Sequence, residues 1–270
     1  MRVVRKLLET LFALILILWV LLPIYFISSL SLSTRKEVFS FPKPFIPREV
    51  SVDILRFFVE AHGTVRSLLN SVVVAFISIL IVLVVSLPAA YALSRRRFRG
   101  RDSIMLFILT SRMLPIPLLA IPLTNLYIAM RLYDSLLGVA LLHAAMALPF
   151  AIIILTGIFV KISKDFEEAA YIFGASKTKT FLKVTLPMAL PGITAMLIFT
   201  FITSWNEVFA ASILTVENRT LSAHVLNVMQ ASPIYFKYAA GFFLSLPAMV
   251  FIFLIRNYLF EMWGGLQSEK

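Results

Sequence analysis

The sequence predicts an all-α membrane protein with six transmembrane helices in one domain, residues 1–270. Hydrophobic residues make up 60% of the 270 residues and charged residues only 14%, against roughly 45–50% and 25% in soluble domains. Long stretches carry no charge, and the one from residue 10 to 34 suffices to cross a hydrocarbon core of about 30 Å. Basic residues lie between these stretches and give a net charge of +11. This pattern excludes a soluble enzyme and disfavours nucleic-acid binding, because basic loops of this kind orient membrane proteins.

Each predicted helix corresponds to one apolar stretch. The cores of the first, second and fourth helices contain no charged residue. The third is interrupted only by Arg112 and the fifth only by Glu207, while the sixth carries two charged residues near its end. The predicted bounds, in chain order, are 8–31, 67–94, 104–128, 136–160, 191–215 and 239–262.

The orientation follows from the positions of lysine and arginine. The densest basic cluster, residues 95–101, directly follows the second helix, and further lysines lie in the segment 161–190. The positive-inside rule places both segments in the cytoplasm. With six helices, both termini are then cytoplasmic, and the expected location is the cell membrane, with several passes.

The largest cytoplasmic loop, residues 161–190, is expected to form a short helix, a turn and a second short helix outside the bilayer. Acidic residues crowd the start of the first helix, where they complement its dipole. Gly174 permits the turn, and Pro187 and Pro191 are expected to end the second helix. Such an elbow suits insertion into the groove of a partner. The alternative is a solvated connector whose charges merely keep it soluble.

Several residues of this loop stand at a spacing that is typical of one family. Glu168-Ala169-Ala170 is followed after three residues by Gly174, and after nine more by Val184-Thr185-Leu186-Pro187. The pattern resembles the EAA loop of ABC-importer permeases, with Val184 in place of isoleucine. Further segments are similar to recurring segments of the carbohydrate-uptake permeases: Asn70-Ser71, residues 110–115, Leu148-Pro149-Phe150 and Trp205-Asn206-Glu207. Over nearly its whole length the chain resembles the MalG-like permeases of maltose-type sugar importers.

The resemblance implies a MetI/MalG-like permease fold whose cytoplasmic elbow acts as a coupling helix. It further implies a permease subunit that moves a sugar or oligosaccharide inward by alternating access, driven by a separate ATPase. The implied partners are a second, MalF-like permease, a cytoplasmic ATPase dimer and an extracytoplasmic solute-binding protein. The residues expected to couple to the ATPase are Glu167, Glu168, Ala169, Ala170, Gly174, Leu186 and Pro187.

The chain itself is not expected to be an enzyme. It contains no phosphate-binding Gly-x-x-x-x-Gly-Lys-Ser/Thr motif, so ATP and Mg²⁺ are expected to bind the partner ATPase. No catalytic residue is expected, and no cofactor in this chain. No metal site is expected, because there is no cysteine and the three histidines are far apart.

Polar residues within the predicted helices are candidates for a translocation pathway. A charge in the membrane costs at least about 2.5 kcal/mol when unpaired, so Arg112 and Glu207 should face protein or water. The alternatives are a structural ion pair, or an arginine that reaches the interface. Trp205 equally suits an interfacial anchor. The pathway candidates are Arg112, Asn125, Trp205, Asn206 and Glu207.

The predicted external loop between the last two helices, about residues 217–237, is expected to contact the solute-binding protein. Its polar groups suit a sugar or a sugar-binding cleft, and Pro233 stiffens the tip. The alternative is an ordinary connecting loop with tyrosine anchors at the interface. The candidates are Asn227, Gln230, Ser232, Pro233 and Tyr235.

Two other functions stay open at this point. A secondary transporter or channel that works alone would need an ion site, for which Arg112 and Glu207 are the candidates. An ABC permease for a non-sugar solute, such as glycerol phosphate or an oligopeptide, would share every feature of the cytoplasmic loop.

Overall fold

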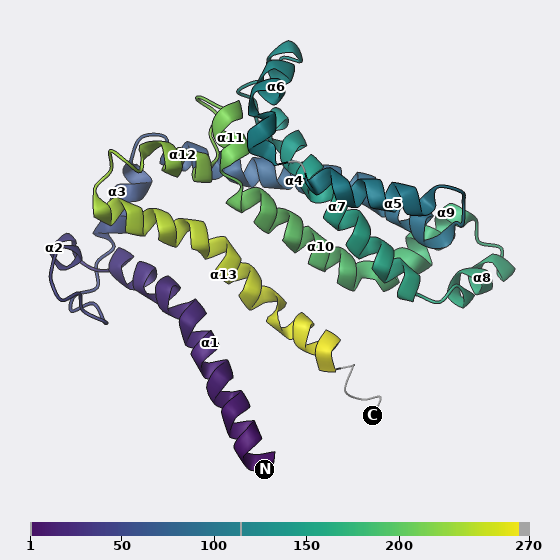
Figure 1. Ribbon diagram of the computed structural model, residues 1–270, viewed down its shortest axis with the longest axis horizontal. Helices are drawn as coiled ribbons and strands as arrows, with labels where there is room; N and C mark the ends of the chain where they lie inside the picture. Colours follow the sequence, from purple (N-terminus) through teal and green to yellow (C-terminus); the bar gives the residue numbers. More distant parts are fainter. Residues whose placement is uncertain (1, 114, 265–270) are drawn as a thin grey trace. The chain divides into compact units, whose positions relative to one another are not determined.

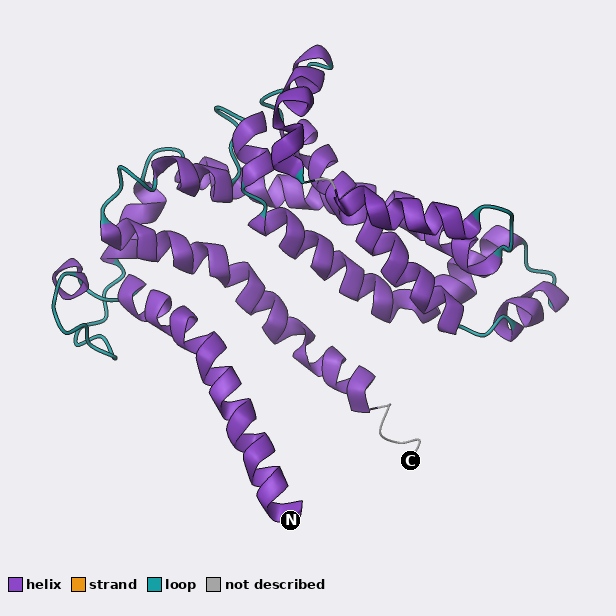
Figure 2. Cartoon of the chain, in the orientation of Figure 1, coloured by secondary structure: helices purple, strands orange, loops and turns teal. Residues whose placement is uncertain are grey.

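The structure, a computed structural model, describes residues 2–113 and 115–264 (Figure 1). Every regular element within these residues is a helix (Figure 2). The chain divides into two compact units. The first comprises Met1–Val65 and Val225–Lys270, and the second comprises Arg66–His224.

The first unit is built on two long helices. α1 (Arg2–Ser31) packs against α13 (Ile234–Gly264), and Gly241 allows the approach because a Cβ there would lie 3.1 Å from Ile27. Two short helices, α2 (Arg35–Val38) and α3 (Asp53–Glu60), directly follow α1 in the chain. α3 buries Phe58 against α13, where its ring stacks on Phe243 at 5.1 Å.

The second unit centres on α7 (Leu136–Lys161), which packs against α10 (Leu186–Asn206) and lies in one core with α4 (Thr64–Arg95). Small residues set this packing. Ala144, Ala147 and Ala151 are fully buried on α7, and a Cβ on Gly192 of α10 would overlap Ile158. The backbones of α7 and α10 therefore approach closely, as small-residue interfaces in membranes allow.

The remaining helices of the second unit are short. α5 (Arg101–Thr110), the 3₁₀ turn η1 (Ser111–Met113) and α6 (Ile116–Ala129) precede α7. Between α7 and α10 lie α8 (Asp165–Ile172), α9 (Lys177–Thr180) and the π-helical turn η2 (Phe181–Thr185). α11 (Phe209–Leu214) follows α10, and α12 (Leu221–Val228) continues into the first unit.

Four predicted helices differ from those observed, and the first of them begins at Arg2 and not at residue 8. The segment 104–128 is broken, with α5–η1 and α6 bent by 94°, because Pro115 and Pro117 remove helical donors and restrict the residues before them. The segment 191–215 ends as a helix at Asn206, where Glu207 is extended, and α11 is separate. The helix predicted at 239–262 begins earlier, at Ile234.

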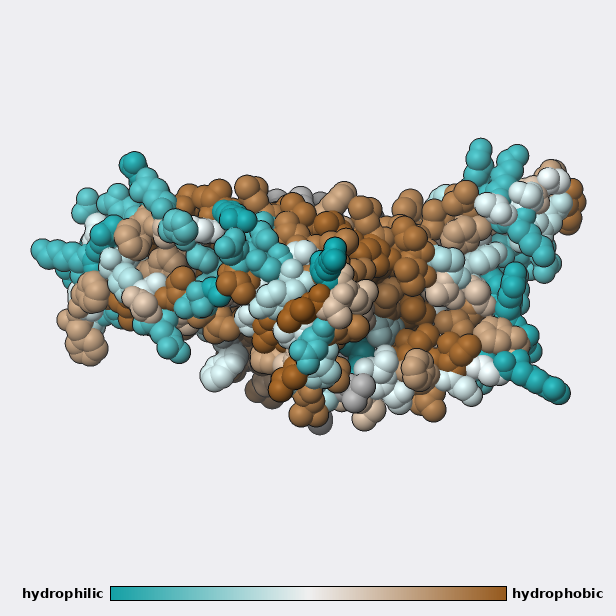
Figure 3. All heavy atoms as spheres, turned by 90° about the horizontal axis from the view of Figure 1, so that it is seen from above, coloured by the Kyte–Doolittle hydropathy of each residue, from teal (hydrophilic) through white to brown (hydrophobic). Residues whose placement is uncertain are grey.

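Length and hydropathy identify the helices that can cross a membrane. Among the described residues four helices qualify, or five if the bent pair is one span. Large apolar side chains are exposed along them, such as Trp19, Phe76 and Val84, and brown residues cover much of the surface in Figure 3. Exposure of this kind is costly in water and favourable in lipid. The count of six spans stays a prediction.

Candidate functional site

The first short helix and the turn predicted in the loop 161–190 are present, and Gly174 forms the turn. α8 ends at Ile172, Phe173 is its C-cap, and Gly174 follows with a left-handed φ of +82°. The amide of Ala175 donates to the Ala170 carbonyl at 2.9 Å, and that of Gly174 donates to the Tyr171 carbonyl at 2.9 Å. These bonds form a Schellman motif, which satisfies the last carbonyls of the helix. A Cβ on Gly174 would meet no atom within 4 Å, so its backbone conformation, and not crowding within this chain, requires glycine.

The second arm of the elbow departs from the prediction. Ser176 caps α9 through its side chain, and α9 continues through η2 into α10 as one apolar helix from Lys177 to Asn206. Pro187 and Pro191 therefore do not end a helix. Pro187 directly follows the π-helical turn η2, where the regular helical hydrogen-bond pattern is already interrupted.

The two adjacent acids of α8 have different environments. Glu168 is exposed, whereas Glu167 is 5% exposed. The Oε1 atom of Glu167 accepts from Arg95 Nε at 2.8 Å and from Thr185 Oγ1 at 2.9 Å, and Oε2 accepts from the Tyr91 hydroxyl at 2.9 Å. We call these four side chains the Glu167 hub. Of the two acids expected to couple to the ATPase, only Glu168 is therefore exposed on the surface of the elbow.

Arg95 extends the hub to a third helix. Its Nη1 donates to the Phe159 carbonyl at 2.8 Å and its Nη2 to the Ile162 carbonyl at 3.0 Å. These carbonyls belong to the C-terminal end of α7 and the residues after it, where a cation complements the helix dipole. The side chains of Arg95 and Glu167 are only 9% and 7% exposed. One buried ion pair thus joins the ends of α4 and α7 to the start of α8.

Two phenylalanine rings pack against Tyr91 of the hub and shield the hub from solvent. The Tyr91 ring lies 4.7 Å from that of Phe181 and 5.8 Å from that of Phe159. Because the surrounding dielectric is low, removing one partner of such an ion pair costs about 3–5 kcal/mol. The hub therefore fixes the orientation of α8 relative to α4, α7 and η2.

The opposite side of the elbow is apolar and exposed. Ile172 is 83% exposed and Phe173 is 89% exposed, and Phe166 is exposed as well. Ala169 is exposed and Ala170 is half-buried, and neither carries a bulky side chain that would cover this part of α8. Exposed apolar surface beside so many charges indicates a protein contact. Of the other predicted coupling residues, Leu186 packs against the buried core and Pro187 is exposed.

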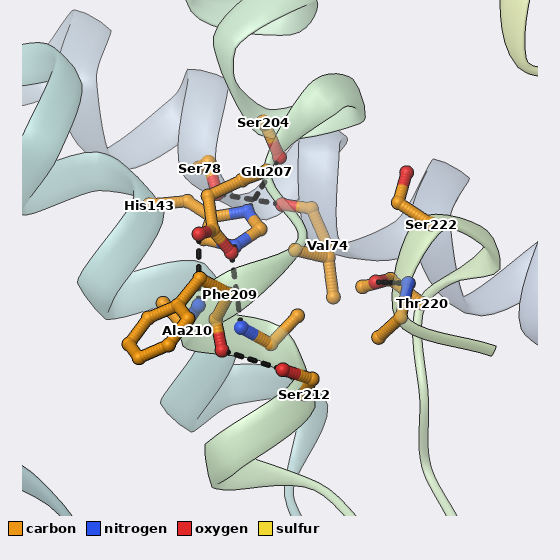
Figure 4. Close-up of polar contacts among 12 residues, drawn as sticks. Val74, Ser78, His143, Ser204, Glu207, Phe209, Ala210, Ser212, Thr220 and Ser222 are labelled. Atoms are coloured by element: carbon orange, nitrogen blue, oxygen red, sulfur yellow. Dashed lines mark hydrogen bonds and ion pairs between the residues drawn. The ribbon is translucent and has the colours of Figure 1, made fainter. Parts of the chain in front are cut away.

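A second cluster of buried polar side chains lies where α7, α10 and α11 meet (Figure 4). His143 Nε2 lies 3.2 Å from Glu207 Oε2, and His143 Nδ1 lies 2.9 Å from Ser204 Oγ. Glu207 also accepts from the amides of Ala210 at 2.8 Å and Ala211 at 2.9 Å, which are free donors at the start of α11. Since Glu207 is an acceptor, a neutral His143 carries its proton on Nε2 and accepts from the Ser204 hydroxyl.

The structure does not form the ion site proposed from Arg112 and Glu207. Glu207 pairs with His143, whereas Arg112 is exposed in η1, with its guanidinium 5.8 Å from the centre of the Phe150 ring. The role of Glu207 in this arrangement is to bind the start of α11 to α7.

The other pathway candidates are not equivalent. Trp205 is 5% exposed and stacks on Phe201 at 5.6 Å, so it is neither an interfacial anchor nor an open sugar platform in this structure. Asn125 and Asn206 are exposed. Within residues 2–113 and 115–264, no three His, Asp or Glu side chains converge as a metal site requires.

The segment that follows α11 is fixed to the second unit. Asp134, at a φ of 53°, accepts from the amides of Val216 at 2.9 Å and Asn218 at 3.0 Å. Asn70 donates to the Arg219 carbonyl at 3.0 Å, and Ser71 accepts from the Leu221 amide at 2.7 Å. The Asn70-Ser71 pair therefore holds this segment in place.

The predicted external loop is partly open and partly packed. Asn227, Gln230 and Pro233 are exposed, and Ser232 donates to the Val228 carbonyl at 2.7 Å. Tyr235 is half-buried, with its ring 5.2 Å from Phe57 and beneath the guanidinium of Arg35. Tyr235 is thus part of the packing of the first unit and not a free group at the tip.

Comparisons with known proteins match this architecture. The family described as binding-protein-dependent transport system inner membrane component matches residues 82–261. The trehalose transport system permease protein of Mycobacterium tuberculosis is 31% identical over 245 residues, which cover 88% of this chain and 89% of the relative. The diacetylchitobiose uptake system permease protein of Streptomyces coelicolor is 27% identical over 195 residues, which cover 72% and 71%.

Solved structures agree on the fold. A chain of a bacterial ABC transporter involved in the import of alginate superposes with a TM-score of 0.78 at 21% identity, and the match covers 94% of this chain and 96% of that one. A chain of the MetNI methionine ABC transporter superposes with a TM-score of 0.58 at 18% identity, covering 73% and 92%.

Proposed function

This chain belongs to the family of binding-protein-dependent transport system inner membrane components, and from that membership we propose that it is the permease subunit of an ATP-driven importer of a sugar or oligosaccharide. The sugar class is supported by relatives named for trehalose, diacetylchitobiose and alpha-glucoside transport. The proposal includes six spans, cytoplasmic termini, and a complex with a second permease, an ATPase dimer and a solute-binding protein.

The observation that carries the proposal is the two-sided character of α8. One side presents Ile172 and Phe173 to solvent, and the other side is anchored by the Glu167 hub. A partner that binds the exposed side therefore moves the ends of α4 and α7 along with α8, because those ends share one buried ion pair.

The proposed cycle is alternating access of the membrane helices. ATP and Mg²⁺ bind the partner ATPase, whose closure displaces the elbow, and this chain contributes no hydrolytic group. Arg112, Asn125 and Asn206 are the polar side chains on the predicted pathway that remain accessible. Asn227, Gln230 and Pro233 form the accessible part of the proposed contact with the solute-binding protein.

The test replaces Phe173 by glutamate in the complete complex. A charge on the exposed side of α8 should release the ATPase during purification and abolish uptake of the sugar that the solute-binding protein binds. Phe41→Glu is the matched control, since Phe41 is 97% exposed in the segment between α2 and α3. Retention of the ATPase and normal uptake by Phe173→Glu would remove the elbow from the coupling role.

A further inference from the structure

A basic cavity lies where α4 and α7 end, next to the Glu167 hub. Its volume is about 330 Å³, and residues 94–97, 101, 160 and 162–164 line it. Five of these nine residues are arginine or lysine, and none of the nine is acidic. The cavity lies wholly within the second unit.

The cations around this cavity are not equally engaged. The guanidinium of Arg95 donates to Glu167 and to the two carbonyls at the end of α7, as described above. Arg101 donates to the Leu93 carbonyl at 2.7 Å and lies 3.4 Å from Asp102. The side chains of Arg96, Arg97 and Lys164 make no hydrogen bond or ion pair with any residue that the structure describes. Three positive charges thus converge without a counterion from the described chain.

We propose that this cavity binds the phosphate group of an anionic phospholipid. The inference rests on the proposed orientation, which places the ends of α4 and α7 at the cytoplasmic face. Helix ends lie at the depth of the lipid headgroups, and basic pockets between transmembrane helices on the cytoplasmic side bind such headgroups. Arginine pairs with phosphate through two parallel hydrogen bonds, and the volume is that of a small-molecule site.

A bound headgroup would connect the segment after α4 to the segment that leads into the elbow. Arg96 and Arg97 lie in the connection from α4 to α5, and Lys164 immediately precedes α8. Occupancy would neutralise their mutual repulsion and hold the base of the elbow. Anionic lipid in the cytoplasmic leaflet would therefore strengthen the coupling between ATP hydrolysis and transport.

The experiment compares the double variant Arg96→Gln/Arg97→Gln with Arg99→Gln in the purified complex. Arg99 belongs to the same basic cluster but does not line the cavity. Complexes are equilibrated in nanodiscs with phosphatidylglycerol or with phosphatidylcholine alone, and the retained lipid is counted by native mass spectrometry. Each removed charge should lower phosphatidylglycerol affinity about fivefold. Arg99→Gln and Arg96→Lys/Arg97→Lys should retain it.

Three results would overturn the proposal. The first is equal phosphatidylglycerol retention by the double glutamine variant and the unchanged protein. The second is unchanged lipid retention with loss of the ATPase, which would assign the cavity to a protein partner. The third is saturation by inorganic phosphate with no preference between the two lipids. Lipid counting does not depend on transport, so a complex that fails to move sugar still tests the cavity.

Discussion

Glu167 exchanges the hydration of its carboxylate for three donors, from Arg95, Tyr91 and Thr185, at 2.8 to 2.9 Å. A buried carboxylate is stable only when its acceptors are satisfied in this way. Its neighbour Glu168 remains in solvent. Two identical residues one position apart thus serve different purposes, and substitutions at the two positions should separate them.

Glu167→Gln should lower the stability of the assembled complex by about 3 kcal/mol, because it leaves the Arg95 charge buried without a counterion. Glu168→Gln should stay within about 0.5 kcal/mol, as surface substitutions do. Thermal denaturation in detergent measures the difference, and ATP hydrolysed per sugar transported should rise for Glu167→Gln alone. Adding Arg95→Gln to Glu167→Gln should restore part of the stability. Equal shifts in the denaturation midpoint for both single variants would contradict the hub.

At the scale of elements, the elbow depends on how α8 ends. Gly174 and Gly157 both have open space around the position of a Cβ, yet only Gly174 has a left-handed φ. Alanine is strained in that conformation by about 1–2 kcal/mol, whereas alanine within a helix is favoured over glycine by about 1 kcal/mol.

Gly174→Ala should therefore weaken ATPase coupling, and Gly157→Ala, near the C-terminal end of α7, should leave it unchanged. The measurement is ATPase activity stimulated by the loaded solute-binding protein, in proteoliposomes of equal protein content. Gly174→Asn should be milder than Gly174→Ala, since asparagine tolerates the left-handed region. If Gly174→Ala leaves coupling unchanged, the left-handed conformation at this turn is not required for docking to the ATPase.

Helices with uniform apolar sequence were predictable, and interrupted ones were not. α4 and α7 match the predicted 67–94 and 136–160 within a few residues, because each is uniformly apolar and continues past its single internal proline, Pro88 and Pro149. The break before α6 was missed because prolines raise no charge signal in a hydropathy scan. α11 was merged with α10 because Glu207 was interpreted as a membrane charge, whereas its carboxylate accepts two amides of α11.

At the scale of the whole molecule, long-range partners were the part that sequence could not supply. Arg95 was interpreted only as a charge that sets orientation, yet its partner Glu167 lies 72 residues away in the chain. Glu167 and Glu168 look alike until Tyr91 and Thr185 are in place. The first helix of the elbow and its turn at Gly174 were predictable because they depend on local sequence, whereas the second arm, which continues into α10, was not.

The six-span topology can be tested directly, since the chain contains no cysteine. Gln230→Cys should react with an impermeant maleimide in right-side-out vesicles, because Gln230 is exposed in the predicted external loop. Lys179→Cys, exposed in α9, should react only in inverted vesicles. Labelling of both positions from the same side would require an even number of crossings between them and would refute the topology.

The Glu167 hub also limits how this transporter subunit can be recombined with others. A chimera that receives residues 161–190 from a relative has the relative's residues in place of Glu167 and Thr185. It keeps this chain's own Arg95 and Tyr91 on α4. If the donor's loop evolved against a different α4, the graft brings a buried carboxylate to a site without its donors. The unit that can be exchanged between relatives therefore consists of two separate segments of the chain. The loop and the C-terminal end of α4 must be exchanged together for the elbow to keep its orientation.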